Sequence, residues 1–374
     1  MPALRTVSPF AGPQFPTNIP ASISEGLLCY QRFQNLYGVD PVSGEILWVR
    51  EDIRPDSVVF GDERYVLVLP PEKSEAMILR ADDGRSLGMT RSLPSQRLVT
   101  LGRLIASWRL ENHRTVLELM DPLDGRPVWP AQAFDQDAKV YAVDNEAVGV
   151  FEPKKGHFTL VNLADGRKLI DHEIRPEVGM SDLHIFRSAD ETLLVVSGLE
   201  RAASSGHHYY GLQGVPSVQV GRGKIYAFDP QGKPLWKEPV SVRDQYLVLH
   251  QPRRLPALIF ACSVQEQRTN IMGPPRTTIL AVDKRTGQVF RPKERFEGVS
   301  HFRLEGNAEA KAIEIRLQRE LVSLKFTDQP VKAGGKEDEK KPAAKPSSAL
   351  LKAFKRAAQR GLNLPSDADE EGPQ

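Results

Sequence analysis

The residues whose chemistry stands out first lie in one Gly- and Ser-rich stretch, residues 200–222, which holds His207, His208, Tyr209 and Tyr210. Two histidines could bind a metal ion. However, neighbouring residues of an extended chain point in opposite directions and no cysteine is close in sequence, so no metal site is predicted. Aromatic side chains on an exposed loop are typical anchors for a binding partner. We therefore interpret the stretch as a candidate binding loop. A variable insertion that binds nothing is the simpler alternative, and both remain open.

A second polar stretch, residues 265–276, contains Asn270 and Arg276. Both stretches fall between the second and third predicted strands of consecutive sheets. We therefore expect them to emerge at the same end and to form a raised rim there. Asn270 and Arg276 complete the predicted binding loops.

Two carboxylates and two cysteines are the other candidates for chemistry. Asp182 and Asp244 precede predicted innermost strands, where a carboxylate pair could hydrolyse glycosides. Acids solvated at turns are the simpler interpretation, so no catalytic residue is assigned. Cys29 and Cys262 are too few and too far apart for a disulfide framework, and we expect them to be small buried hydrophobes.

All of these candidates sit in a tandem repeat of one β-hairpin. The best copy is LYGVDPVSGEILW, residues 36–48. Its Asp can accept hydrogen bonds from N–H groups two residues on, and its Gly supplies the positive φ of the turn. The turn glycines recur at intervals of 40, 41, 41, 66 and 55 residues. A period of about 40 residues with several short strands is typical of a β-propeller built of four-stranded blades. These glycines are Gly44, Gly84, Gly125, Gly166, Gly232 and Gly287.

Three copies keep the full pattern of Asp, Gly and Trp, and a fourth keeps Asp and Gly. They are Asp40/Gly44/Trp48, Asp121/Gly125/Trp129, Asp229/Gly232/Trp236 and Asp283/Gly287. The motif, about A-x-D-x-x-[TS]-G-x-x-x-W, resembles the repeat of the PQQ-like (quinoprotein alcohol dehydrogenase-like) propellers over residues 26–327. The resemblance implies a bacterial and usually exported protein. Turn capping explains the Asp residues and packing between blades explains the Trp residues, so none of them is a catalytic candidate.

Enzymes of that family share an adjacent Cys–Cys pair over the cofactor, a calcium ion held by Glu and Asn, and a catalytic Asp. This sequence has no adjacent cysteines. No cofactor is therefore predicted, and PQQ with calcium is not expected. In character the chain is closer to the non-enzymatic BamB-type members.

Composition narrows the range of partners. The 374 residues include 50 Lys and Arg against 48 Asp and Glu, and residues 329–374 hold 9 basic and 7 acidic side chains, which leaves 41 of each sign in the rest. A neutral propeller argues against nucleic-acid binding. No secretory signal is recognised in residues 1–25, and no apolar run is long enough for a transmembrane helix. The compartment stays open: cytoplasmic by default, exported by resemblance.

The expected architecture is an all-β propeller of four-stranded antiparallel blades, with seven blades or alternatively eight. The expected segments are an irregular Pro-rich stretch at 1–25 in which Leu4 to Phe10 could close the last blade, the propeller at 26–328, and a disordered tail at 329–374 with a short basic helix at 347–361. That helix could dock on a partner or an anionic surface through Leu351 and Phe354, or it could be frayed.

The predicted function is a non-catalytic scaffold that binds a protein partner or ligand through its loop face. The alternative is an enzyme that acts at the central channel, either a quinoprotein-like oxidoreductase or a carbohydrate-active enzyme.

Overall fold

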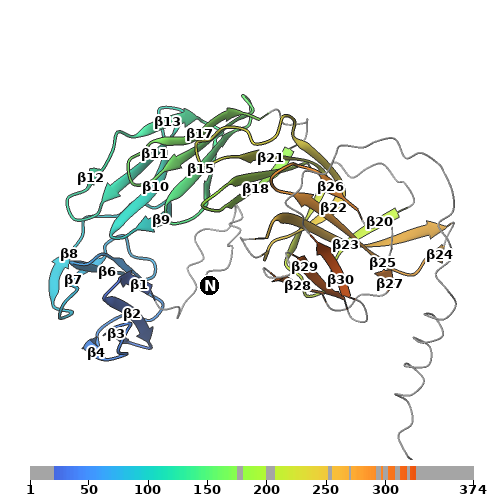
Figure 1. Ribbon diagram of the computed structural model, residues 1–374. Coiled ribbons are helices and arrows are strands. Elements are labelled where there is room, and N and C mark those ends of the chain that lie inside the picture. Colours follow the sequence, from blue (N-terminus) through green and yellow to red (C-terminus); the bar gives the residue numbers. More distant parts are fainter. Residues whose placement is uncertain are drawn as a thin grey trace, which may run out of the picture. The chain divides into compact units, whose positions relative to one another are not determined.

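The computed structural model describes residues 21–325, apart from residues 175–179, 199–206, 252–254, 269–270, 292–295, 298–301, 308–311 and 318–320. Every regular element in these residues is a β-strand, and every strand pairing is antiparallel (Figure 1). Within the same residues, no helix has the length and apolar character needed to cross a membrane. The predicted contact of Leu4 to Phe10 and the predicted helix at 347–361 lie outside the described residues.

The first two sheets have four strands each. Sheet 1 contains β1 (Ala21–Ser24), β2 (Leu27–Arg32), β3 (Asn35–Val39) and β4 (Ile46–Arg50), and sheet 2 contains β5 (Val58–Gly61), β6 (Tyr65–Leu69), β7 (Met77–Arg80) and β8 (Ser86–Met89). β1 falls in the segment that was predicted to be irregular. It forms because Ala21 and Ser22 pair with Cys29 and Leu28 of β2.

The next two sheets follow the same order. Sheet 3 contains β9 (Arg97–Leu101), β10 (Leu104–Glu111), β11 (Arg114–Asp121), β12 (Arg126–Pro127) and β13 (Gln132–Asp135), and sheet 4 contains β14 (Lys139–Ala142), β15 (Ala147–Glu152), β16 (His157–Asn162) and β17 (Lys168–Glu173). In sheet 3 the outer strand is divided, and β12 and β13 both pair with β11.

Sheet 5 has ten strands and combines two repeats. It contains β18 (Met180–Arg187), β19 (Thr192–Gly198), β20 (His207–Gly211), β21 (Ser217–Phe228), β22 (Val240–Val248), β23 (Ala257–Arg268), β24 (Ile271–Met272), β25 (Arg276–Asp283), β26 (Val289–Phe290) and β27 (Phe296–Glu297). Sheet 6 contains β28 (Phe302–Asn307), β29 (Ala312–Leu317) and β30 (Leu321–Lys325).

The two halves of sheet 5 share β22. Val240 pairs with Ile225 of β21, and Leu247 pairs with Phe260 of β23. The sequence predicted two separate strands here, at 235–240 and 246–250. A single strand forms instead because residues 217–222 lengthen β21 and give the later part of β22 a partner, as Val220 pairs with Gln245.

The repeated Asp and Gly residues shape the turn between the third and fourth strands. Asp40 Oδ1 accepts hydrogen bonds from the Val42 N–H at 2.7 Å and the Ser43 N–H at 3.3 Å, and the Gly44 N–H donates to the Asp40 carbonyl at 2.8 Å. Gly44 has a φ of +73°, which glycine adopts without strain. The carboxylates of Asp121, Asp229 and Asp283 accept equivalent bonds, and Gly125, Gly232 and Gly287 have φ values of +72°, +79° and +72°.

The repeated tryptophans join consecutive sheets. Each buried indole N–H donates to a carbonyl in the following repeat: Trp48 to Ala81 at 2.8 Å, Trp129 to Leu163 at 2.9 Å and Trp236 to Lys284 at 3.0 Å. Each ring also lies against the turn glycine of that repeat, at Gly84, Gly166 and Gly287. A Cβ atom would lie 2.6 Å from the ring at Gly84, 2.8 Å at Gly166 and 3.0 Å at Gly287. The Trp of one repeat and the Asp–Gly turn of the next repeat therefore form one structural unit.

Arginines bridge two other pairs of consecutive sheets. Arg103 of sheet 3 binds Asp62 of sheet 2 and its own Asp121, the latter at 2.7 Å. Arg187 of sheet 5 binds Asp144 of sheet 4 at 2.7 Å. These ion pairs join sheet 2 to sheet 3 and sheet 4 to sheet 5, the two places where Gly88 and Ile170 stand at the Trp position of the motif.

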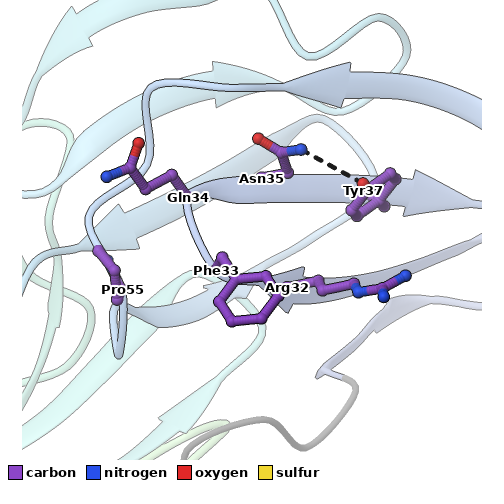
Figure 2. Close-up of a pocket in the computed structure, with 6 residues that line it drawn as sticks. All are labelled: Arg32, Phe33, Gln34, Asn35, Tyr37 and Pro55. Atoms are coloured by element: carbon purple, nitrogen blue, oxygen red, sulfur yellow. Dashed lines mark hydrogen bonds between the residues drawn. The ribbon is translucent and has the colours of Figure 1, made fainter.

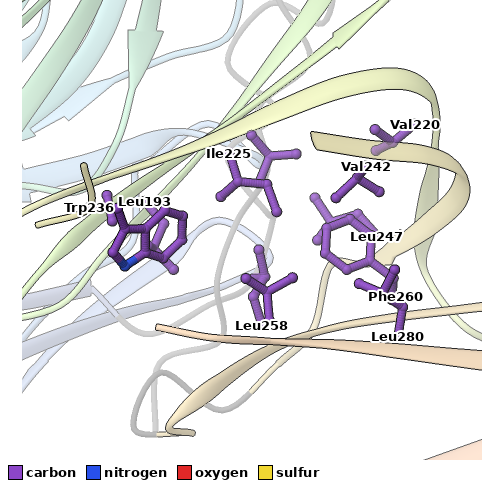
Figure 3. Packing of buried hydrophobic residues seen from close by; sticks show 12 residues of the cluster. Leu193, Val220, Ile225, Trp236, Val242, Leu247, Leu258, Phe260 and Leu280 are labelled. Atoms are coloured by element: carbon purple, nitrogen blue, oxygen red, sulfur yellow. The ribbon is translucent and has the colours of Figure 1, made fainter. Parts of the chain in front are cut away.

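The core consists of apolar clusters between consecutive sheets. In β6, Val66 and Val68 pack towards sheet 1, whereas Leu67 and Leu69 pack towards sheet 3, because successive side chains of a strand point to opposite faces. The largest cluster joins the two halves of sheet 5 (Figure 3), for example Ile225 with Leu258 and Phe260. Each sheet has three to five antiparallel strands, apart from sheet 5, which combines two repeats. Such sheets, packed face to face in chain order, are the arrangement of β-propeller blades.

Candidate functional site

In the described part of the predicted binding loop, residues 207–222, most residues lie in the strands β20 and β21, which corrects the expectation of a loop there. β20 crosses to the next repeat and pairs with β23, from His207 opposite Glu266 to Gly211 opposite Cys262. The backbone polar groups of β20 gain partners in this way. The two long stretches lie side by side here, since His207 and His208 pair with Glu266 and Gln265 at the start of the second stretch. The raised rim stays a prediction.

The strand geometry divides the predicted site residues between two faces. His207 and Tyr209 lie on one face of β20, and His208 and Tyr210 lie on the other, because side chains alternate along a strand. Arg276 is the first residue of β25 and pairs with Val264 of β23, which itself pairs with Tyr209. Asn270 lies outside the described residues.

The face with His207 and Tyr209 holds β20 in place. His207 Nε2 lies 3.5 Å from Glu266 Oε1, and the Tyr246 hydroxyl donates to the Tyr209 carbonyl at 3.3 Å. Among the described residues, no group of three or more His, Cys, Asp or Glu could hold a metal ion.

The face with His208 and Tyr210 is open to solvent. The two rings stack with centroids 6.4 Å apart and planes 23° apart, and Tyr210 is 44% exposed. A stacked aromatic pair on a paired strand offers apolar area and a hydroxyl at low cost in side-chain entropy. We call this pair the β20 surface.

The carboxylate candidates are arranged differently. Asp182 Oδ2 lies 3.4 Å from Nε2 of His184, which is buried on the innermost strand β18. Neither ring nitrogen of His184 has a hydrogen-bond partner among the described residues. Burial lowers the pKa of His184 and outweighs the opposing Asp182 carboxylate, so the imidazole is neutral near pH 7. Asp244 lies in β22 with a φ of +51°.

Both cysteines are buried and unpaired in disulfides. Burial raises the pKa of Cys29 to about 12 and that of Cys262 to about 11, so neither thiol is a nucleophile near pH 7. The prediction of two small buried hydrophobes is confirmed.

A second surface site was not foreseen from the sequence. Phe33 and Gln34 form the two-residue turn between β2 and β3, and Phe33 is 79% exposed with a φ of +54°. A two-residue hairpin turn with this φ at its first position favours Gly. The sequence signal for this site is therefore a bulky aromatic residue at a tight-turn position that favours Gly or Asn.

Gln31 fixes the backbone around this turn. Its Nε2 donates to the carbonyls of Phe33 at 3.0 Å and Arg54 at 2.7 Å, and its Oε1 accepts from the Ser57 N–H at 3.2 Å. One carboxamide thus joins the turn to the segment that leads into sheet 2.

A shallow hollow of about 560 Å³ opens between the turn and that segment (Figure 2). Its lining residues are exposed or half-buried: Arg32, Phe33, Gln34, Asn35, Tyr37 and Pro55. Asn35 Nδ2 donates to the Tyr37 hydroxyl at 3.4 Å, and the Tyr37 ring stacks on Tyr30 at 4.9 Å. We call this the β2–β3 hollow.

No protein-family model and no curated protein matches the sequence. Among solved structures, the chain is similar to BamB from Moraxella catarrhalis, with 14% identity, a TM-score of 0.29, and coverage of 84% of this chain and 85% of that chain. It is also similar to Kluyveromyces lactis Hsv2, with 8% identity, a TM-score of 0.35, and coverage of 80% and 90%. A third is the dihydro-heme d1 dehydrogenase NirN in complex with DHE, with 15% identity, a TM-score of 0.30, and coverage of 82% and 70%. At these TM-scores the likenesses assign neither a family nor a function to the chain.

Proposed function

We propose that the chain is a seven-bladed propeller of the PQQ-like repeat type that acts as a non-catalytic platform and binds a protein partner through the β20 surface. The repeat motif and the antiparallel sheets support the fold, with sheet 5 counted as two blades and each other sheet as one. The function rests mainly on one observation: the insertion between the second and third strands of one repeat is built into the next repeat as a strand.

This arrangement suits binding because it makes the exposed rings rigid. β20 is paired with β23 over five residue pairs, from His207 to Gly211. A site on a strand is held more precisely than one on a loop, so little conformational entropy is lost when a partner covers Tyr210. The stacked His208 ring restricts Tyr210 further.

Photo-crosslinking tests this proposal. A photoreactive amino acid at position 210 in cells that make the protein should capture a partner, whose affinity is then measured with purified proteins. We expect Tyr210→Ala to weaken binding about 30-fold, the effect of losing about 2 kcal/mol at an interface anchor. Leu235→Ala is the matched control, because Leu235 is 41% exposed but lies outside β20. Equal affinities for the two variants would refute the proposal.

Catalysis on the innermost strands is a second candidate. The observation in its favour is His184, a buried imidazole with two unpartnered nitrogens among the described residues and a carboxylate at 3.4 Å. A neutral histidine beside an Asp can act as a general base. Turnover of a panel of glycosides and primary alcohols that is abolished by His184→Gln, with an unchanged Tm, would favour the enzyme. If the wild-type protein turns over none of these substrates, the non-catalytic platform remains the proposed function.

A further inference from the structure

Phe33 has a strained backbone conformation, and the packing of its side chain does not compensate for this strain. Its φ of +54° is strained for a bulky side chain, and the ring is 79% exposed and belongs to none of the buried clusters. Strain held at an exposed side chain next to a hollow is a feature of binding sites.

Hydrogen bonds and ring stacking order part of the lining of the hollow before anything binds. Gln31 fixes the turn through bonds of 2.7 to 3.2 Å, and Tyr30 supports the Tyr37 ring with planes only 10° apart. A ligand would therefore meet an arranged surface rather than order one on binding.

We propose that the β2–β3 hollow binds an extended, proline-containing segment of a partner protein that carries an acidic side chain close to the proline. Phe33, Tyr37 and Pro55 provide the ring faces on which polyproline-type peptides dock. The carboxamides of Gln34 and Asn35 can bond the peptide backbone, which polyproline conformation leaves without internal hydrogen bonds.

The positive charge of Arg32 favours an acidic residue in the bound peptide. Arg32 is the one charged side chain among the six that line the hollow, and it forms no ion pair with any described residue. An arginine beside an aromatic surface binds a carboxylate through two parallel hydrogen bonds. A neutral sugar would use the rings and amides but would leave the guanidinium unmatched, so an acidic peptide fits better. This site is separate from the β20 surface and does not rest on the function proposed above.

Fluorescence anisotropy with the full chain tests the proposal. One probe is a pool of labelled dodecapeptides with a Pro-x-x-Pro core and two flanking aspartates, and the other is the same pool with lysines in place of the aspartates. The wild-type protein should bind the aspartate pool saturably. Arg32→Glu should lose at least tenfold in affinity for it and gain affinity for the lysine pool. The control Arg64→Glu, an exposed arginine at the opposite end of the neighbouring sheet, should behave as wild type.

Phe33→Gly separates binding from folding. It should lower affinity at least tenfold, while Tm stays the same or rises by about 1–3 °C because the strained φ is relieved. Absence of saturable binding to the aspartate pool would overturn the proposal, as would equal binding by Arg32→Glu. Saturable binding of an uncharged oligosaccharide such as chitohexaose that Phe33→Gly abolishes would also overturn it and assign the hollow to a sugar.

Discussion

The contact between each tryptophan and the next turn glycine can be isolated by comparing glycines that share a backbone conformation. Gly44 and Gly166 have φ values of +73° and +71°, so an alanine at either position incurs a similar left-handed strain of about 1–2 kcal/mol. A Cβ at Gly44 meets nothing within 4 Å, whereas a Cβ at Gly166 would lie 2.8 Å from the Trp129 ring. Displacing that ring adds an overpacking cost of about 1–3 kcal/mol.

We therefore expect Gly166→Ala to lower the free energy of unfolding by about 1–3 kcal/mol more than Gly44→Ala. Urea unfolding followed by tryptophan fluorescence measures both. Gly84→Ala should repeat the larger effect, since its Cβ would lie 2.6 Å from Trp48. Gly125→Ala should repeat the smaller one, since its nearest neighbour is the flexible Arg91 side chain at 3.6 Å. Equal losses of unfolding free energy in Gly44→Ala and Gly166→Ala would refute the idea that the indole packs tightly against the turn of the next repeat.

Two further predictions concern the ion pairs and the cysteines. Burial raises the pKa of the Asp62 carboxyl, but the hydrogen bonds from Arg103 and from two backbone N–H groups outweigh it and lower the pKa below 3.8. The stability that this carboxylate contributes is present above the unfolded pKa and is lost as the pH falls through the folded one. Arg103→Met should thus cost about 2 kcal/mol at pH 7 and should flatten the fall of Tm below pH 4. An equally steep fall in the variant would contradict the role of the bridge. Cys29 and Cys262 should react with a maleimide only after unfolding, and labelling of either in the native protein would contradict their burial.

Much of the fold could be predicted because its signals are local. The Asp and Gly of each hairpin determine the turn through bonds within five residues, and they recur at a spacing that implies sheets in chain order. Alternating burial also follows from the sequence pattern in β29, where Ile313 and Ile315 are buried and Arg316 is exposed. The bridge at Arg103 could not be predicted, since its partner Asp62 lies 41 residues away in another sheet.

The candidate sites depend on contacts between segments that are far apart in the sequence. The sequence singled out His208 and Tyr210 by type, but the pairing of β20 with β23 joins residues from different repeats. The opposite orientation of His207 and His208 follows from the sequence for an extended chain, but their partners Glu266 and Gln265 do not. At the β2–β3 hollow, the bonds from Gln31 to Phe33 and Arg54 bring two segments together, and neither segment is unusual in composition.

Backbone hydrogen exchange of the full chain, with and without the partner captured at position 210, tests the platform most directly. The account predicts slower exchange at residues 207–211 and at their β23 partners 262–266. It predicts no change at the motif turn 40–45, because this turn joins the third and fourth strands of sheet 1, whereas β20 lies between the second and third strands of its repeat. Protection at the motif turns, or no protection in β20, would contradict it.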